Sequence, residues 1–257
     1  MSQCIVVPAY NAAKHLRGVI ERIEVVRPAD GRVVIVDDGS TDGTAALARE
    51  LATGRTPERD WLTVLTRPRN GGYGAAMKTG LEHARQSGAD RAASVHADGQ
   101  YSPEVLPDLL RALESRGLDL LQGSRIAGGG ALAGGMPLYK YAGNGALNKL
   151  ERVAFGLPLT DFHSGYLVYG PRALGTIPFE RLGDSFDFDL EVIAAARARG
   201  LAVGEAPIPT HYGDEISHLN PFTYGLRVLR VMWRFKRGAY APQGETRSTM
   251  SSKLVTR

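Results

Sequence analysis

The sequence predicts an α/β fold with a mostly parallel central sheet flanked by helices on both faces. Short, nearly continuous apolar runs alternate with longer segments of helical periodicity along most of the 257 residues. Strands that are apolar on both sides are typical of parallel sheets buried between helices. Polar clusters follow several of these runs, and ligands of open parallel sheets bind at the carboxyl ends of the strands. The pattern therefore predicts the fold class and the edge that carries the site.

The first half of the chain gives the clearest elements. Apolar runs predict five strands, at residues 4–7, 32–37, 61–66, 91–95 and 118–122. Apolar residues that recur every three or four positions predict helices between them, at residues 12–25, 44–51, 74–86 and 103–115. Pro103 suits the first turn of the last of these helices.

The second half is less regular, and its elements are predicted with fewer signals. Strands are expected at 166–169 and 201–205, and helices at 139–155, 186–199 and 221–237. The glycine-rich stretch 124–137 predicts a flexible loop. We expect a catalytic domain over 1–220, an amphipathic basic helix over 221–240 and a disordered polar tail over 241–257.

Composition limits the classes of protein to which the chain can belong. A net charge of +4 suits an anionic ligand and does not indicate nucleic acid. The one cysteine, Cys4, excludes an intrachain disulfide framework. No signal peptide is recognised, and no apolar stretch approaches the ~20 residues of a membrane span. We therefore expect a cytoplasmic protein, either soluble or peripheral at the inner face of a membrane.

The most informative stretch follows the fourth predicted strand. His96, Asp98 and Gln100 alternate there, so an extended backbone places their side chains on one side, about 7 Å apart. Magnesium takes few protein ligands and completes its coordination with phosphate and water. The stretch predicts a site for a metal ion and a diphosphate, with His96 either a ligand or a hydrogen-bonding residue.

Three other polar clusters lie at predicted strand ends or before a helix: residues 8–11, 37–44 and 70–74. Asp37 and Asp38 end an apolar strand side by side, which favours a functional role, although Asp, Gly and Ser also favour turns and helix caps. The glycines of 70–74 permit close approach of an anion to a helix start, but a plain turn explains them equally well.

Five motifs in order carry a resemblance to a known family: Val7-Pro8-Ala9-Tyr10-Asn11, Val36-Asp37-Asp38-Gly39-Ser40-Thr41-Asp42, Asn70-Gly71-Gly72, Ala97-Asp98-Gly99-Gln100 and Gly123-Ser124-Arg125. Over about residues 3 to 215 the chain resembles the family 2 glycosyltransferases, most closely the dolichol-phosphate mannose synthase or polyprenyl-phosphate glycosyltransferase group. The resemblance implies a GT-A fold, a nucleoside-diphosphate sugar donor carrying UDP or GDP, and Mg²⁺ or Mn²⁺.

The resemblance also implies roles for particular residues. Asp98, Gln100 and His96 are expected at the metal, and Arg125 near a donor or acceptor phosphate. The donor-binding set is expected to be Pro8, Tyr10, Asn11, Asp37, Asp38, Gly71, Lys78, Ala97 and Asp98. Three positions depart from the family: Ala12 replaces a glutamate, His96 the first acid of an Asp-x-Asp-type motif, and Lys140 an arginine. Histidine is a softer ligand than carboxylate, which affects the metal preference.

The acceptor side is expected in the second half of the chain. Asp161 is the candidate catalytic base, with His163 nearby, although a turn-capping role is the alternative. Asp187, Asp189 and Glu191 begin a predicted helix, where acids also complement the helix dipole. His211, Tyr212 and Ser217 lie in a loop expected to close over the donor.

The helix 221–237 has one basic stripe and one apolar face. The stripe contains Arg227, Arg230, Arg234 and Arg237, and the apolar face contains Phe222, Leu226, Leu229 and Trp233. Two interpretations are open: a surface helix packed on the domain, or an interfacial helix on anionic lipid. The second suits a lipid-phosphate acceptor.

We therefore expect an inverting, metal-dependent glycosyltransferase with Arg125 and Asp161 in the catalytic site. A polyprenyl phosphate acceptor needs no base, whereas a soluble hydroxyl acceptor does, with Asp161 as the candidate. The absence of a membrane span from the sequence keeps a small-molecule acceptor open. Two further classes of protein are a non-catalytic nucleotide-sugar-binding protein and a sugar-phosphate nucleotidyltransferase. The last is disfavoured because residues 8–11 replace its basic, glycine-rich loop.

Overall fold

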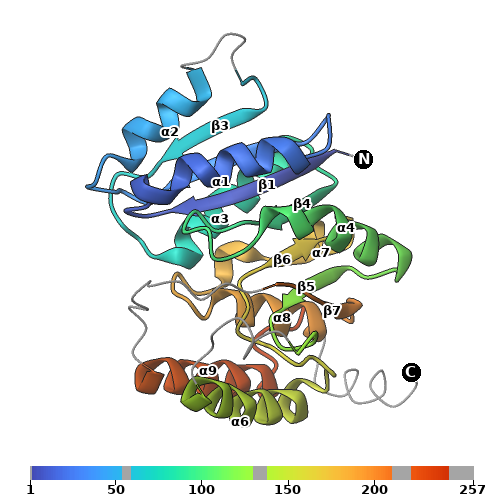
Figure 1. Ribbon diagram of the computed structural model, residues 1–257. Coiled ribbons are helices and arrows are strands. Elements are labelled where there is room, and N and C mark those ends of the chain that lie inside the picture. The colour runs from blue at the N-terminus through green and yellow to red at the C-terminus, as the bar shows by residue number, and fades with distance from the viewer. Residues whose placement is uncertain (1, 54–58, 130–137, 210–220, 243–257) are drawn as a thin grey trace.

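A seven-stranded sheet forms the centre of the computed structural model, which describes residues 2–53, 59–129, 138–209 and 221–242 (Figure 1). The first strands are β1 (Gln3–Ala9), β2 (Arg32–Asp37), β3 (Leu62–Thr66) and β4 (Arg91–Ser94). They pair in parallel and are joined through α1 (Ala13–Val26), α2 (Thr44–Thr53) and α3 (Tyr73–Gln86). The α/β fold predicted from the apolar runs is confirmed.

One reversed strand distinguishes the second half of the sheet. β6 (Leu167–Tyr169) runs antiparallel to β4 and to β5 (Leu120–Ser124), while β7 (Val203–Pro207) is parallel to β5. The strand order is β3-β2-β1-β4-β6-β5-β7. The apolar pattern does not predict this reversal, because a strand buried on both faces has the same composition in either direction. As a result, the start of β6 meets the ends of β4 and β5 at one edge.

Helices cover both faces of the sheet, so the core has two halves. α1, α2 and α4 (Leu106–Ser115), which follows the 3₁₀ turn Pro103–Val105, contribute to one half. α3, α7 (Pro171–Thr176), the 3₁₀ turn Phe179–Arg181 and α8 (Phe188–Ala198) contribute to the other. Along β1, Ile5 and Val7 enter the first half, and Cys4 and Val6 the second. This division follows from the alternation of side chains along a strand.

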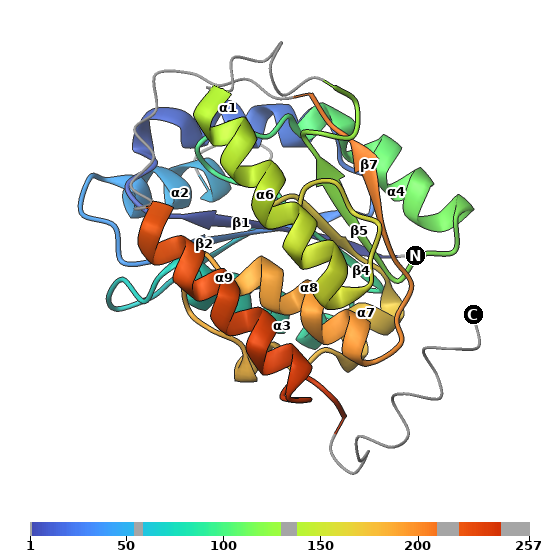
Figure 2. The same cartoon turned by 90° about the horizontal axis from the view of Figure 1, so that it is seen from below.

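Two further helices, α6 (Leu138–Phe155) and α9 (Pro221–Lys236), lie side by side at the end of the molecule farthest from β3 (Figures 1 and 2). α9 packs on the core through Val228, Val231 and Met232. Within the ranges given above, none of the helices combines the length and hydropathy that a membrane span requires.

Some predicted features lie outside the described residues. They are the loop residues His211, Tyr212 and Ser217, residues 130–137 of the glycine-rich stretch, the side chain of Lys140, and residues 243–257 of the polar tail.

Candidate active site

The ends of β1 and β2 form the first part of the site. Asn11 has φ of 50°, and its Oδ1 accepts a hydrogen bond from the Thr41 backbone N–H over 2.9 Å. The Asn11 N–H donates to Ser40 Oγ, also over 2.9 Å. These two bonds tie the loop after β1 to the loop after β2. Tyr10 is 49% exposed beside them. Because Ala9 pairs with Asp37 in the register of β1 and β2, the structure places Tyr10, Asn11 and Asp37 close together.

The two carboxylates that end β2 have different surroundings. Asp38 accepts the backbone N–H of Gly71 over 3.1 Å and that of Gly72 over 2.8 Å, and it pairs with Arg67. Asp37 is 1% exposed; one oxygen accepts a backbone N–H, and Oδ2 has no partner among the described residues. A buried carboxylate oxygen is costly without a donor. Asp38 therefore fixes a loop, while Asp37 keeps one buried carboxylate oxygen without a hydrogen-bond donor among the described residues.

The loop before α3 is held by close backbone packing. Gly72 has φ of 97°, and a Cβ there would lie 2.5 Å from the carbonyl oxygen of Asp184. Lys78 donates to the carbonyl of Leu182 over 3.1 Å and pairs with Asp184 over 2.5 Å. Lys78, expected to bind the donor, is instead engaged in holding the segment 182–184 against α3.

The segment after β4 is a turn, and the prediction of an extended stretch there is wrong. β4 ends at Ser94, residues 97 and 98 form a turn, and Gly99 has φ of 77°. Asp98 Oδ1 accepts the backbone N–H of Gln100 over 3.0 Å, a local bond typical of aspartate in turns. His96, Asp98 and Gln100 do not line one face of a strand, because the turn breaks the two-residue alternation.

His96 is packed among aromatic rings. Its Nε2 lies 3.1 Å from the Tyr73 hydroxyl, and its ring centroid is 5.1 Å from that of Tyr73 and 4.9 Å from that of Tyr101. Burial lowers the pKa of the imidazole, although the charge of Asp98 opposes this. The neutral ring is engaged within the protein, which disfavours the role of metal ligand expected for His96. The geometry supports the alternative of a hydrogen-bonding histidine behind the turn.

The Tyr73 hydroxyl connects His96 to an acid at the start of α8. It also bonds the carboxyl group of Asp189, which is 7% exposed. Burial raises the pKa of Asp189 to about 7, against the lowering effect of the Tyr73 hydrogen bond. Sequence reasoning missed Tyr73; its only signal is an aromatic residue directly after the glycines of the 70–74 loop.

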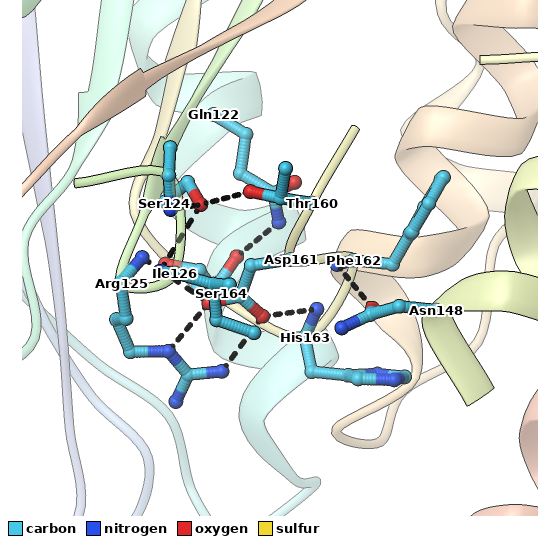
Figure 3. A network of polar contacts seen from close by, with 12 residues as sticks. Gln122, Ser124, Arg125, Ile126, Asn148, Thr160, Asp161, Phe162, His163 and Ser164 are labelled. Atoms are coloured by element: carbon cyan, nitrogen blue, oxygen red, sulfur yellow. Dashed lines mark hydrogen bonds and ion pairs between the residues drawn. The ribbon is translucent and has the colours of Figure 1, made fainter. Parts of the chain in front are cut away.

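Arg125 and Asp161 form a buried pair where β5 ends and the segment leading to β6 begins (Figure 3). Arg125 Nε lies 2.7 Å and Nη2 2.9 Å from the two carboxylate oxygens. The Asp161 side chain is fully buried, and Oδ1 also accepts the His163 backbone N–H over 3.1 Å. Burial alone raises the pKa of Asp161, but the charge and hydrogen bonds of Arg125, with His163, hold it below its usual value. Asp161 is thus a stable carboxylate and a weak base.

The donor atoms at this edge decide which metal ion fits. Among the residues that the structure describes, no three His, Cys, Asp or Glu side chains gather around a common point. Asp98 contributes a carboxylate after β4. One hard oxygen ligand fits a divalent cation that takes its other ligands from a diphosphate and water, and does not fit a cation enclosed by protein.

The surface of α9 differs from the predicted stripe. Two of the four arginines of the predicted stripe are engaged with the protein: Arg227 pairs with Asp187 over 3.3 Å, and Arg234 pairs with Glu191. The predicted apolar face is outward instead, with Leu226, Leu229 and Trp233 at 53%, 48% and 55% exposure. Neighbouring α6 also exposes Leu150 and Val153, at 53% and 80%. The helix is therefore packed on the domain and presents an apolar surface.

The fold is that of the GT-A glycosyltransferases. The structure of glucosyl-3-phosphoglycerate synthase from Mycobacterium tuberculosis, in complex with Mn²⁺, UDP and glucosyl-3-phosphoglycerate, has a TM-score of 0.62 to this one. The match covers 95% of this chain and 81% of that chain at 15% identity. The likeness concerns the fold, and it confirms the GT-A type expected from the motifs.

Sequence comparison gives the family. The model of "Glycosyl transferase family 2" matches residues 4–176. The chain is 31% identical to the polyprenol monophosphomannose synthase of Mycolicibacterium smegmatis over 79% of this chain and 75% of that protein. It is 28% identical to the UDP-N-acetylglucosamine--dolichyl-phosphate N-acetylglucosaminyltransferase of Methanococcus voltae, over 82% of this chain and 86% of that protein. The chain belongs to the family 2 glycosyltransferases, as its five motifs predict.

Proposed function

We propose that this enzyme transfers a sugar from a UDP- or GDP-sugar to a polyprenyl phosphate. The observation that carries the choice of acceptor is the state of Asp161, which is fully buried and held by Arg125 through both oxygens. A hydroxyl acceptor needs a base, and a carboxylate with a lowered pKa and occupied oxygens is a poor one. A phosphate oxygen is already anionic and needs none. Both relatives described above carry a polyprenol or a dolichyl phosphate in their names.

The donor is proposed to lie along the ends of β1, β2 and β4. Pro8 and Tyr10 would hold the base, and the unsatisfied Oδ2 of Asp37 would accept a hydrogen bond from the nucleoside. Asn11 orders the loops on either side through its bonds to residues 40 and 41. Ala97 and Asp98 would border the diphosphate at the turn after β4.

Asp98 is proposed to hold Mg²⁺ or Mn²⁺ together with the donor diphosphate. When bound, such a cation neutralises charge on the departing nucleoside diphosphate as a Lewis acid. Arg125, which Asp161 holds in one orientation, would place a fixed positive charge near the phosphate groups of the donor or the acceptor. Attack on the face of the sugar opposite the leaving group inverts the anomeric configuration. This inversion is a consequence of direct displacement.

The function is tested by offering matched acceptors to the purified enzyme. We expect transfer from a UDP- or GDP-sugar to a short-chain polyprenyl phosphate, supported by Mg²⁺ or Mn²⁺ and abolished by EDTA, with no transfer to the matching polyprenol. NMR of the product should show the inverted anomer. Equal transfer to polyprenol or to soluble hydroxyl acceptors would contradict the proposed acceptor. Release of pyrophosphate from a nucleoside triphosphate and a sugar phosphate would indicate a nucleotidyltransferase.

The surface of α6 and α9 is proposed to rest on the membrane that holds the acceptor. Exposed apolar side chains on both helices, with the exposed Arg230 and Arg237 beside them, suit an anionic lipid surface. Trp233, at 55% exposure with Arg237 stacked 4.0 Å from its ring, reports on this contact.

In a Trp61→Phe variant, which leaves Trp233 as the one tryptophan of the sequence, vesicles of anionic phospholipid should shift the fluorescence to shorter wavelength, because the indole leaves water. Leu229→Asp should weaken vesicle binding by about ten-fold, since it places a charge in the apolar face. Val25→Asp on α1, where Val25 is 84% exposed, is the matched control and should bind as the wild type does. Unchanged binding of Leu229→Asp would exclude this surface as the contact.

A further inference from the structure

A buried carboxyl group and a buried imidazole lie together beside Asp161. Glu151, on α6, has a fully buried side chain, and His163 Nε2 lies 3.2 Å from its Oε2. His163 itself is 6% exposed. Among the described residues, His163 is the one group at ion-pair distance from Glu151. The contact is a close approach and not a hydrogen bond, because both Glu151 carboxyl oxygens and His163 Nε2 have no hydrogen-bond partner among the described residues.

The same imidazole also contacts α9. Its Nδ1 lies 3.0 Å from the Tyr224 hydroxyl, and the two ring centroids are 5.5 Å apart at 71°. Both nitrogens of His163 therefore face a partner, one on each of the two outer helices. The positions of α6 and α9 together define where this ring lies.

The backbone of His163 continues the connection to the candidate catalytic pair. Its N–H donates to Asp161 Oδ1 over 3.1 Å, and Asp161 holds Arg125 (Figure 3). One turn before Glu151, Asn148 Oδ1 accepts the Phe162 backbone N–H over 2.9 Å. The segment 161–163 is thus fixed to α6 at two points and to α9 at one.

We propose that His163 is a positioning residue. Its contacts with α6 and α9 hold the segment 161–163 in place and thereby orient the Asp161–Arg125 pair. The inference rests on the proposed function for its activity assay. The two hydrogen bonds of His163, from its backbone N–H to Asp161 and between its Nδ1 and Tyr224, fix directions that apolar packing leaves free. His163 touches no reacting atom in this arrangement and acts through Asp161.

Tyr224→Phe tests the link with the smallest change, since it removes one hydroxyl group and leaves the ring packed. We expect kcat for transfer to polyprenyl phosphate to fall about five-fold, the equivalent of one hydrogen bond, with the KM for the nucleotide sugar unchanged. Tyr169→Phe is the matched control, because the buried Tyr169 hydroxyl has no hydrogen-bond partner among the described residues. That variant should keep the wild-type kcat.

Two substitutions of His163 separate its contacts. His163→Asn keeps a polar atom near the Nδ1 position, and His163→Gln keeps one near Nε2. We expect each to retain part of kcat and His163→Ala to lose about 30-fold, with donor affinity unchanged in all three. The proposal is overturned if neither His163→Asn nor His163→Gln has a higher kcat than His163→Ala. It is also overturned if all three variants have the wild-type kcat. A fall in melting temperature with a normal kcat per folded molecule would also overturn it, since that result indicates packing alone.

NMR distinguishes a failure of this inference from a failure of the proposed function. The ring ¹⁵N shifts of His163 should change in Tyr224→Phe and in Glu151→Gln, and the backbone ¹⁵N–¹H signal of His163, which bonds Asp161, should move with them. These signals need no acceptor. If they move while no lipid phosphate is glycosylated, the acceptor assignment is wrong and the link stands. If the His163 N–H signal stays in place, the link is absent whatever the acceptor.

Discussion

Asp98→Asn should lower the rate of sugar transfer by about 10³-fold or more, because it removes the carboxylate proposed to hold the divalent cation. The amide keeps the side-chain oxygen that accepts the Gln100 N–H, so the turn and the fold should persist. The measurements are single-turnover transfer and the thermal shift caused by nucleoside diphosphate with Mn²⁺. Both the activity and the metal-dependent part of the shift should disappear.

Asp108→Asn on α4 is the control for this experiment. Asp108 is 69% exposed and pairs with Arg111 on the surface, so the same change of charge should have almost no effect there. Full activity and a normal metal-dependent shift in Asp98→Asn would mean that the cation is held elsewhere, or that transfer needs none.

Asp161→Asn should have the largest effect on stability, about 3 kcal/mol, because it leaves the Arg125 guanidinium without its buried counter-charge. The rate of sugar transfer should fall as well, since Arg125 loses the two-point contact with the Asp161 carboxylate that orients it. Arg172→Lys provides the comparison: it alters an ion pair with Asp119 in which Arg172 is 66% exposed, and it should change stability by less than about 1 kcal/mol. Chemical denaturation measures both.

The pH dependence of this loss follows from the direction of the pKa shift of Asp161. Its folded-state pKa is below its unfolded value, so the carboxylate stabilises the protein fully above the unfolded pKa, about 4. That contribution is lost as pH falls through the lower folded-state pKa. The difference in unfolding free energy between wild type and Asp161→Asn should be constant from pH 7 to pH 5 and shrink below about pH 4. A difference that grows toward acid would contradict the ion pair.

Most of the fold was predictable because its strands are buried. Apolar runs such as 32–37 appear in the structure with the same bounds, and the helical periodicity of 74–86 shifts by one residue to Tyr73–Gln86. The direction of β6 was not predictable, because neighbouring strands and not its own residues decide it. The short helix α7 was missed since its six residues are too few for a periodic signal.

The position of a candidate residue was predictable where it follows a buried strand, as for Asp37 at the end of β2 and Asp98 after β4. The role of a residue was not predictable where tertiary contacts decide it. The sequence left two roles open for His96, and Tyr73, from another element, favours the hydrogen-bonding one by engaging its nitrogen. Lys78 differs because the segment around Asp184 folds back onto α3. Pairing across the fold leaves no signal in sequence spacing.

The place of β6 in the sheet also determines whether the chain can be divided. The residues proposed to bind the nucleotide precede Ser124, and those of α6, the 161–163 segment and α9 follow it. In the sheet, the two stretches join through the antiparallel pairing of β6 with β4 and β5 and the parallel pairing of β5 with β7. Because β6 lies between β4 and β5, the earlier stretch alone would leave a gap in the middle of the sheet. Neither stretch can therefore form this sheet without the other, and a cut after Ser124 should give two fragments that fold only together.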